Sequence, residues 1–597
     1  MQTYTTPGGA VVSPHVNVIQ QLEARATDAP DHPALAFREG DGFSTVTTQE
    51  LWDTVIELAA GLVAAGINPG DRIALHSSTR IEFTYFDYAI WAAGAATTTI
   101  YETSSPEQVE WIISDSGSVM LITENEGTRA VFDEVAEGLE DCSDVLIIGD
   151  GAIAALRAMA TDEGRLEVAR RIAAIEHSDL ATLVYTSGTT GNPKGCVLSH
   201  YNFAWLIANL NGSVPELVTP ENRTFMFLPL AHIFARAVQS SAVSTGVTMY
   251  YSSGMDNLLE EFPMAKPTWI FSVPRVFEKI YNGAKAKADA DGKGKIFDKA
   301  VDVAIAYSKD VERGRTKIAT KLAHATFDKL VYAKIRERFG GDVAYAISGG
   351  APLGARLGHF FRGIGLTALE GYGLTETTAG ATVNTPRAIR VGSVGRPLPG
   401  VSIGIADDGE VLIKGGMVFD GYWKNAGATS DVLSDDGWFR SGDIGELDDE
   451  GYLSITGRKK EIIVTSAGKN VAPAVLEDRM RRNPLVSQTI VIGDAKPFIA
   501  ALVAIDQEAL TPWAAAHRKE GVPWEELRRS DDLIAAVGSA VDEANKAVSH
   551  AEAIKEFRIL PEDLSVGGGE LTPTLKMRRA VVAAKYADLI DDIYEPR

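Results

Sequence analysis

Short strand-like runs that open into glycine-rich turns restrict the fold of this chain more than any other feature. The runs Thr182–Tyr185 and Val343–Ile347 both end in such turns. The segment Leu51–Ala65 has apolar residues at three- and four-residue spacing, and the turn after it leads into a strand-like run at Arg72–His76. Strand, turn and helix in alternation predict an α/β fold with a large share of parallel sheet.

A chain of 597 residues is too long to fold around one hydrophobic core. The sequence pattern changes after Gly457, where the charged run Arg458–Ile463 begins. We therefore predict a large region of several α/β subdomains with parallel sheets over residues 1–457. A second, small α/β unit is predicted over residues 458–597.

The overall charge and the cysteine usage exclude several classes of protein. A formal charge of −23 argues against a general nucleic-acid binder. The only two cysteines, Cys142 and Cys196, have no metal-ligand spacing, which predicts a reducing, cytoplasmic location. The amino terminus lacks the pattern of a secretory signal. The most apolar stretch, residues 88–101, is shorter than the about 20 residues of a membrane-spanning helix.

Residues 279–338 differ from the rest of the chain in charge. They contain 15 Lys or Arg against 8 Asp or Glu, a net charge of +7, and they are helix-prone around the flexible patch Asp291–Lys295. A solvated helical insertion is the more ordinary interpretation. The alternative is a patch that meets anionic lipid headgroups, which would place the protein peripherally at the inner membrane face, or that binds a polyphosphate ligand.

A loop rich in glycine and hydroxyl groups, TSGTTGNPKG, gives the strongest sign of chemistry. Its glycines let the backbone approach a ligand closely, and its hydroxyl and N–H groups can surround a phosphate. It is not a Walker A loop, because Gly195 follows Lys194 where Ser or Thr would be needed. These residues alone leave an ordinary flexible loop open. The candidate phosphate ligands are Thr186, Ser187, Gly188, Thr189, Thr190, Gly191 and Lys194.

The run YTSGTTGNPKG resembles the signature loop of the adenylate-forming superfamily, which includes acyl-CoA synthetases. Further motifs match in the same order, from about Leu51 to Lys576. The resemblance implies a large AMP-binding and acyl-binding domain over residues 1–457, followed by a small, mobile α+β domain over residues 458–597 that carries a catalytic lysine. It also implies that the loop holds the β- and γ-phosphates of ATP.

The motif EGYGLTET supplies an aromatic ring, two glycines, hydroxyls and a carboxylate. By the same resemblance Tyr372 stacks on adenine, Thr375 contacts the α-phosphate and Glu376 holds Mg²⁺, an ion that accepts one protein carboxylate together with nucleotide phosphates. The upstream segment SGGAPL would cover the other face of the adenine. The implied nucleotide-site residues are Gly350, Ala351, Glu370, Gly371, Tyr372, Gly373, Thr375 and Glu376.

Two further motifs surround the predicted domain boundary. In the run WFRSGD, Asp443 has the family position that accepts hydrogen bonds from both ribose hydroxyls, although a Gly-Asp pair alone more often marks a turn. In the run GRKKEII, Arg458 would contact the ribose or a phosphate and Lys460 would be the pivot of the hinge. Gly468 would line the channel for coenzyme A in a second conformation.

The last motif, GELTPTLK, places Lys576 at the family's catalytic lysine. A cation between a carboxylate and the α-phosphate lowers the repulsion between two anions and stabilises the transition state. Most relatives have Gly before this lysine, whereas this chain has Leu575. Long-chain acyl-CoA synthetases share the Thr-Pro-Thr-x-Lys form.

The segment FLPLAHIFAR resembles the acyl-pocket segment of the family and would place His232 near the carboxylate. An isolated histidine in an apolar run is more often a core residue. The resemblance as a whole implies a long-chain fatty acid–CoA ligase that uses fatty acid, ATP and coenzyme A. A fatty acyl-AMP ligase that delivers to a carrier protein and a catalytically inactive nucleotide-binding regulator are the alternatives.

Overall fold

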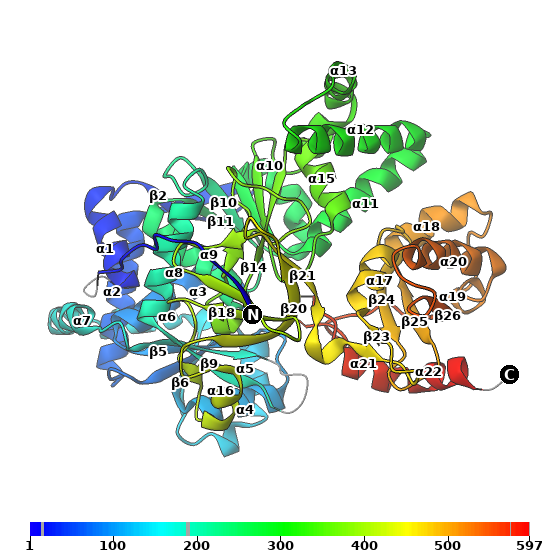
Figure 1. Ribbon diagram of the computed structural model, residues 1–597. Helices are drawn as coiled ribbons and strands as arrows, with labels where there is room; N and C mark the ends of the chain where they lie inside the picture. Colours follow the sequence, from blue (N-terminus) through cyan, green and yellow to red (C-terminus); the bar gives the residue numbers. More distant parts are fainter. Residues whose placement is uncertain (14–16, 187–191, 573–574, 596–597) are drawn as a thin grey trace.

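The computed structural model describes residues 1–13, 17–186, 192–572 and 575–595. Within these residues a large α/β region contains four sheets, and a small unit with two sheets and helices of its own stands beside it (Figure 1). The main hydrophobic core of the large region includes residues from Val18 to Leu453, and the core of the small unit begins at Ile463. The α/β fold class with parallel sheets is confirmed.

The largest sheet has a parallel centre and carries the hairpin that leads into and out of the glycine-rich loop. Strands β7, β6, β4, β5 and β8 pair in parallel, and β9 returns antiparallel to β8. The strands in spatial order are β19 (Gly421–Tyr422), β9 (Lys194–Ser199), β8 (Leu180–Thr186), β5 (Ala96–Ile100), β4 (Arg72–His76), β6 (Ser118–Thr123) and β7 (Asp144–Ile147).

The predicted helix at Leu51–Ala65 is confirmed as α2 (Thr48–Ala64). It begins three residues earlier than predicted, because Thr47 and Glu50 form a capping box in which each side chain accepts a backbone N–H of the other residue. The predicted strand Arg72–His76 is confirmed as β4. Helices that flank this sheet or lie close to it include α1 (Val18–Asp28), α3 (Ile81–Ala92), α4 (Pro106–Ser116), α5 (Glu126–Asp133), α6 (Ala152–Met159), α7 (Asp162–Ala174), α8 (His200–Ser213) and α9 (Ile233–Thr245).

A second sheet carries the motif EGYGLTET at the end of its third strand. The strand predicted at Val343–Ile347 begins two residues later, because Gly340 and Gly341 both have positive φ and extend the preceding turn. Its pairing starts where Tyr345 lies opposite Trp269. The strands in spatial order are β12 (Trp269–Ser272), β13 (Tyr345–Ser348), β14 (Thr367–Tyr372), β15 (Thr382–Val383) and β16 (Arg396–Pro397).

Two further sheets complete the large region, one mixed and one antiparallel. The mixed sheet contains β10 (Arg223–Met226), β11 (Thr248–Tyr251), β2 (Pro33–Glu39) and β3 (Gly42–Thr47). The antiparallel sheet contains β1 (Gln2–Thr5), β17 (Ser402–Ile405), β18 (Glu410–Lys414), β20 (Phe439–Leu447) and β21 (Leu453–Arg458). The register places Asp443 of β20 opposite Arg458 of β21.

The small unit is an α+β fold around strands β24, β25 and β26 (Figure 1, orange to red). The elements of the small unit are β22 (Ile463–Val464), β23 (Asn470–Val471), α17 (Pro473–Met480), β24 (Val486–Ile492), β25 (Ile499–Ile505), α18 (Gln507–Ala516), α19 (Trp524–Leu527), α20 (Asp531–Asn545), β26 (Ile554–Ile559), α21 (Arg579–Lys585) and α22 (Ala587–Tyr594).

Across the described residues, no helix is long and apolar enough to cross a bilayer.

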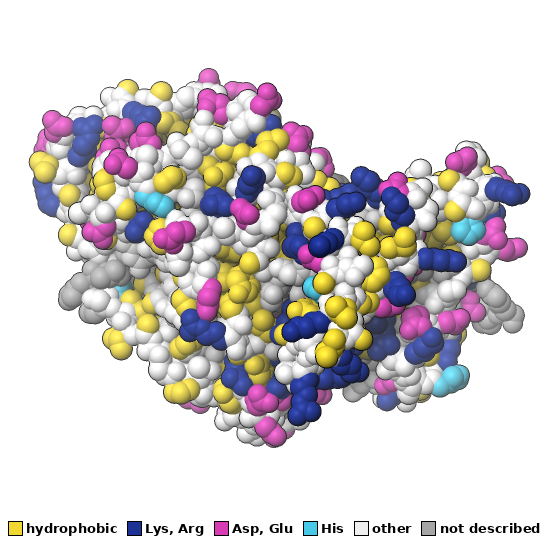
Figure 2. All heavy atoms as spheres, turned by 90° about the horizontal axis from the view of Figure 1, so that it is seen from above, with side chains coloured by type: hydrophobic (Ala, Val, Ile, Leu, Met, Phe, Trp, Pro, Cys, Tyr) yellow, Lys and Arg dark blue, Asp and Glu magenta, His cyan; other side chains and the backbone are white. Residues whose placement is uncertain are grey.

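The basic stretch 279–338 is helical, as its composition predicts, and it projects from the large region with α13 at its tip (Figure 1). Figure 2 views the molecule from this end. The patch Asp291–Lys295 lies at the turn between the first two helices. The helices are α11 (Pro274–Ala290), α12 (Gly294–Glu312), α13 (Ile318–Phe327), the π-helical turn η4 (Asp328–Tyr332) and α14 (Ala333–Glu337), and α15 (Ala355–Gly363) packs beneath them.

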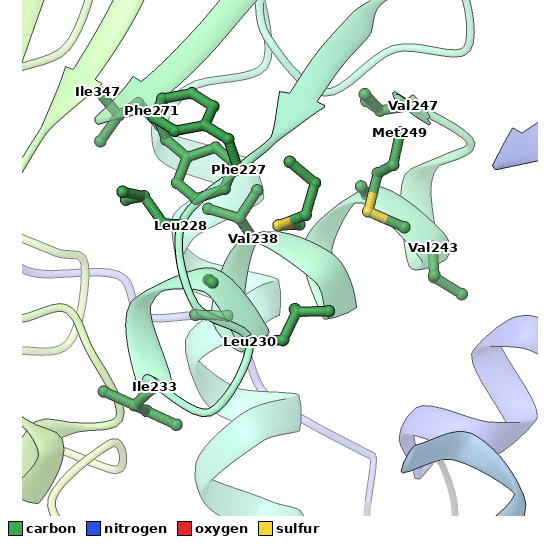
Figure 3. Packing of buried hydrophobic residues seen from close by; sticks show 14 of the residues in the cluster. Phe227, Leu228, Leu230, Ile233, Val238, Val243, Val247, Met249, Phe271 and Ile347 are labelled. Carbon is green, nitrogen blue, oxygen red and sulfur yellow. The ribbon is translucent and has the colours of Figure 1, made fainter. Parts of the chain in front are cut away.

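The segment FLPLAHIFAR enters α9 through a dense apolar core. Figure 3 shows Ile233 and Val238 projecting from this helix, with Phe227 and Phe271 lying against each other nearby. The centroids of these two rings are 6.0 Å apart. This core holds the start of α9 in a fixed position, with His232 directly before it as the N-cap residue.

One ion pair is completely buried and joins α9 to the largest sheet. Arg236 on α9 and Asp87 on α3 are both fully buried, and Nε of Arg236 donates to Asp87 at 3.0 Å. Arg236 also donates to the Thr182 hydroxyl on β8 at 2.6 Å, and Gln239 donates to Asp87 at 3.0 Å. Because β8 ends at the glycine-rich loop, this network fixes α9 relative to that loop.

We expect Arg236→Met to lower the free energy of unfolding by about 3–5 kcal/mol, because it leaves the Asp87 carboxylate buried without its counter-ion. Chemical denaturation measures the change. Arg170→Met is the matched control, since Arg170 pairs with Glu167 while 71% exposed; its effect should stay below about 1 kcal/mol. Equal effects of the two substitutions would contradict the structural importance of the buried pair.

Candidate functional site

One cavity of about 2040 Å³ opens between the large region and the small unit. It collects predicted site residues that are up to about 400 positions apart in the chain. The predicted residues that line it are Thr186, Lys194, His232, Gly350, Ala351, Glu370, Gly371, Tyr372, Gly373, Thr375, Glu376, Asp443, Arg458, Lys460 and Lys576. Ser187, Gly188, Thr189, Thr190 and Gly191 lie outside the described residues, and Gly468 does not line the cavity.

The two strands next to the glycine-rich loop are held by aromatic residues from elsewhere in the chain. The Trp111 indole donates to the Pro193 carbonyl at 2.8 Å, and the Tyr185 hydroxyl donates to Asp115 at 2.6 Å. Trp423 donates its backbone N–H to the Gly195 carbonyl at 2.8 Å. The base of the predicted phosphate loop is therefore fixed from both sides.

Tyr422 connects the predicted metal ligand with the predicted phosphate-binding lysine. Its hydroxyl donates to Oε1 of Glu376 at 2.8 Å, and the Lys194 ammonium lies 5.0 Å from the centre of its ring. Nothing in the local pattern around Gly421-Tyr422-Trp423 indicates this role. Sequence reasoning therefore missed Tyr422, together with Trp111 and Asp115.

The geometry around Glu376 fits a magnesium ion that arrives with a nucleotide. The carboxylate lines the cavity, and the hydrogen bond from Tyr422 fixes its orientation. Within the described residues, no group of three or more His, Cys, Asp or Glu side chains could hold a metal ion. One carboxylate supplemented by phosphate oxygens and water is the coordination that Mg²⁺ accepts.

Asp443, Tyr372 and Arg458 form a polar junction at the wall of the cavity. The Tyr372 hydroxyl donates to Oδ2 of Asp443 at 2.7 Å, and Nε of Arg458 lies 3.2 Å from Oδ1. Burial raises the pKa of Asp443, while the Arg458 charge and the Tyr372 hydrogen bond act against that rise. The junction offers a carboxylate, a ring and a cation at the position where the resemblance puts ribose and adenine.

Lys576 reaches this junction from the small unit. Its Cε lies next to Gly350, where a β-carbon would come within 3.7 Å of it. Burial lowers the pKa of Lys576, and the Arg458 charge lowers it further, whereas Asp443 and Glu376 raise it. The lysine therefore lies among the residues that resemblance assigns to the nucleotide.

Leu575 stands in the left-handed backbone region with φ +60°. This conformation favours Gly, since a side chain costs about 1–2 kcal/mol in it. The Leu575 side chain packs against the core that contains Leu571. The apolar contact offsets part of the backbone strain before the lysine.

Glu370 does not only line the cavity; it also supports the turn opposite. Its Oε2 accepts the Leu353 N–H at 3.0 Å, which holds the turn that carries Gly350 and Ala351. Burial raises the pKa of this carboxyl to about 7, and hydrogen bonds from the backbone act against the rise. Its observed contacts make Glu370 a residue that positions the turn.

His232 lines the cavity as the N-cap residue of α9. Its Nδ1 accepts the Phe234 N–H at 3.2 Å, so the ring proton of the neutral form is on Nε2. Burial lowers the pKa of His232 to about 3, and the Lys576 charge acts in the same direction. Apolar residues that line the same cavity include Leu206, Leu210, Ile233, Ala237, Val238 and Val273.

The structure places Lys460, the residue of the predicted hinge, and Gly468, the residue of the predicted coenzyme A channel, differently relative to the cavity. Lys460 is exposed in the turn after β21 and lines the cavity. Gly468 has φ +77° in the connection between β22 and β23. Lys459, for which the sequence predicts no role, pairs with Asp408 at 2.6 Å and with Glu410 at 3.0 Å.

Comparison with family models gives two matches that together cover most of the chain. Residues 22–423 match the model described as AMP-binding enzyme. Residues 460–597 match the model described as AMP-binding enzyme C-terminal domain.

Curated relatives match over the whole length. The long-chain-fatty-acid–CoA ligase FadD15 of Mycobacterium bovis is 46% identical over 599 residues, covering 100% of both chains. FadD15 of Mycobacterium tuberculosis has the same identity and coverage. The peroxisomal long chain acyl-CoA synthetase 7 of Arabidopsis thaliana is 30% identical, covering 90% of this chain and 80% of its own.

Solved structures share the fold at low identity. The adenylation domain of a carboxylic acid reductase from Segniliparus rugosus, in complex with AMP and a co-purified carboxylic acid, has a TM-score of 0.76 at 21% identity. It covers 97% of this chain and 94% of its own. The anthranilate CoA ligase AuaEII in complex with anthranoyl-AMP has a TM-score of 0.71 at 18% identity, covering 96% and 98%. These likenesses support the fold alone.

Glu370 makes the stability depend on pH in a predictable direction. Its carboxyl keeps a proton more tightly when folded, since its pKa rises from 4.5 to about 7. The stability it supplies is therefore complete below about pH 4.5 and is lost as pH rises toward 7. We expect Glu370→Gln to remove this loss, so that the variant gains about 3 kcal/mol relative to wild type between these limits. Denaturation at several pH values tests this, and parallel pH profiles would contradict it.

Proposed function

This chain belongs to the family of AMP-binding enzymes, and we propose that within it the protein is a long-chain fatty acid–CoA ligase, an AMP-forming acid–thiol ligase. The observation that carries the proposal is the meeting of Glu376, Asp443 and Lys576 in one cavity that apolar side chains also line. Full-length identity of 46% to FadD15 of two mycobacteria supports the choice of substrate class.

The first half-reaction forms acyl-AMP. The fatty carboxylate oxygen bonds to the α-phosphorus of ATP, the bond to the bridging oxygen breaks, and pyrophosphate leaves with that electron pair. Positioning and charge neutralisation supply most of the catalysis in such transfers. Lys194 and the glycine-rich loop would hold the β- and γ-phosphates. Asp443 would hold the ribose, and Lys576 would lie between the carboxylate and the α-phosphate.

Mg²⁺, when bound with ATP, would neutralise phosphate charge beside Glu376. The chain's own contribution is to orient that carboxylate through Tyr422 and to position Thr375 in the same wall of the cavity. His232 would donate from Nε2 to the fatty carboxylate or to the acyl-AMP carbonyl, because its Nδ1 is occupied by the Phe234 N–H.

The second half-reaction transfers the acyl group to coenzyme A. The thiolate sulfur bonds to the acyl carbon, and the bond from that carbon to the phosphate oxygen breaks, releasing AMP. Lys576 lines the present cavity and Gly468 does not. We propose that residues 458–597 turn about Lys460 as a mobile domain, withdrawing Lys576 and bringing the Gly468 connection to the thiol channel. Gating of two chemistries by domain motion is a common enzyme strategy.

We further propose a cytoplasmic location. Both cysteines, Cys142 and Cys196, are free and buried, which supports a reducing compartment.

A coupled AMP-release assay over short to long fatty acids, with and without coenzyme A, tests the proposed reaction. We expect AMP release with long chains only when coenzyme A is present in excess. Transfer to a carrier protein but not to coenzyme A would support an acyl-AMP ligase instead. ATP binding without AMP release from any acid would support an inactive regulator.

Lys576→Ala should slow acyl-AMP formation by about 10²–10³-fold while ATP binding stays close to wild type, because only the transition state loses a stabilising cation. Fatty-acid-dependent pyrophosphate exchange and nucleotide titration measure the two effects. Lys555→Ala is the matched control, since Lys555 is exposed on β26 of the same unit. Unchanged adenylation in the Lys576 variant would contradict the assigned role.

Ion pairs between the two parts favour the present arrangement, in which Lys576 is in the cavity. Arg275 on α11 lies 3.3 Å from Asp506, the residue before α18, and Glu278 lies 3.9 Å from Arg481 after α17. All four side chains are 14–25% exposed. These contacts would have to open before the small domain could turn.

We expect Arg275→Met to slow adenylation by about fivefold and to leave thioester formation from supplied acyl-AMP unchanged or faster, since a half-buried pair contributes about 1 kcal/mol. Single-turnover assays of each half-reaction measure the split. Lys279→Met is the control, because Lys279 and Glu508 are 61% and 75% exposed. An equal loss in both half-reactions would show that the pair acts on the fold alone.

A further inference from the structure

The tip of the basic projection carries apolar side chains that no other element covers. α13, η4 and α14 follow one another without a break from Ile318 to Glu337. Ile318, Leu322 and Leu330 are 79%, 68% and 55% exposed. α13 itself has no buried residue.

These side chains form a stripe beside a second stripe of lysines. The members of each stripe are four or eight residues apart, and residues four apart lie on one face of a helix. Every member is exposed, and the Thr326 hydroxyl in the apolar stripe is satisfied by the Leu322 carbonyl at 3.0 Å. The apolar stripe contains Ile318, Leu322, Thr326 and Leu330, and the cationic stripe contains Lys317, Lys321 and Lys329; together they are named the α13 face.

The opposite side of the same helical run is firmly anchored. The His324 ring stacks on Tyr307 of α12 with centroids 3.9 Å apart. The Tyr332 hydroxyl donates to the Ala300 carbonyl at 2.6 Å, and Arg336 donates to the Ile364 carbonyl at 2.7 Å. The α13 face is therefore presented on a fixed support.

Charges on the tip are left unbalanced. Residues 309–334 contain seven Lys or Arg and three Asp or Glu. Asp310 accepts the Lys317 backbone N–H, Glu312 lies 3.8 Å from Arg362, and Asp328 lies 2.7 Å from Arg336. Across the described part of the chain, none of the seven cations has a carboxylate within the 4.0 Å of an ion pair. These cations are Lys309, Arg313, Arg315, Lys317, Lys321, Lys329 and Lys334.

We infer that the α13 face docks on the surface of an anionic lipid bilayer. Exposed apolar side chains that enter the headgroup boundary, flanked by lysines that meet lipid charge, are the features of a helix that lies in a membrane interface. α13 stands at the outer end of the projection and lines no part of the cavity (Figure 1). Figure 2 shows apolar and cationic side chains together on the surface seen from this end.

The net negative charge of the chain restricts docking on an anionic bilayer to the α13 face. A chain with a net charge of −23 is repelled by an anionic bilayer as a whole. A local group of unpaired cations is the part that such a surface attracts, and attraction falls off within a Debye length. Docking therefore orients the molecule with α13 toward the lipid. The inference does not depend on the reaction that the cavity performs.

Co-sedimentation of the full chain with vesicles tests this docking. We expect wild type to sediment with phosphatidylcholine vesicles that contain phosphatidylglycerol, and much less with phosphatidylcholine alone or at high salt. The triple variant Lys317→Gln/Lys321→Gln/Lys329→Gln should bind on the order of a hundredfold more weakly, at roughly fivefold for each lysine near an anionic surface. The double variant Ile318→Ser/Leu322→Ser should also bind more weakly, and the loss should be largest with the anionic vesicles.

Leu166→Ser is the matched control, because Leu166 is 64% exposed on α7 and outside the α13 face. It should sediment like wild type. All variants should melt like wild type, since the replaced side chains are exposed. Wild type that stays in solution with both vesicle types, or a triple variant that binds as tightly as wild type, would overturn the inference. Self-association lost in Ile318→Ser/Leu322→Ser, without vesicle binding, would assign the face to a second copy instead.

Discussion

The buried Asp443 carboxylate is the interaction around which the site is arranged. It lies on β20 of the antiparallel sheet, opposite Arg458 of β21, and it accepts the hydroxyl of Tyr372 from the end of β14 in another sheet. A buried carboxylate is costly unless it is paired and hydrogen-bonded. Two sheets must therefore meet at the correct distance for the anion to be tolerated. The same requirement places a ring, a cation and an acceptor around one end of the cavity.

The surroundings of Lys576 stabilise its charged form only in part. Asp443 and Glu376 attract it, while burial and Arg458 disfavour its charged form. The preceding Leu575 holds a strained backbone conformation that packing partly offsets. A cation held by such opposing effects is released at lower cost than one in a fully paired, unstrained position. An arrangement of this kind would suit the proposed withdrawal of Lys576 between the two half-reactions.

Local sequence patterns predicted the elements, and motif order predicted which residues would meet. The helix α2 and the strand β4 followed from periodicity, and the strand before Ser348 was displaced only because Gly340 and Gly341 prolong a turn. Contacts between distant segments were not predictable. Tyr422, Trp111 and Asp115 act through pairings that only the folded sheet creates, such as β19 beside β9. The anchoring role of Glu370 was hidden for the same reason, since its partner is a backbone N–H.

The shape of the cavity also limits how chain length can be selected. His232 caps α9 and lines the same cavity as apolar side chains of that helix, so in the proposed mechanism it would present any carboxylate to the same polar groups. Each buried methylene contributes about 0.8 kcal/mol to binding, and an apolar pocket separates neighbouring lengths by at most about 1–3 kcal/mol. A shorter acid would therefore meet the same catalytic residues and differ mainly in how tightly it is held. In the proposed mechanism, selection for long chains comes from binding along the apolar side chains that line the cavity, while the chemistry at Lys576 stays common to all lengths.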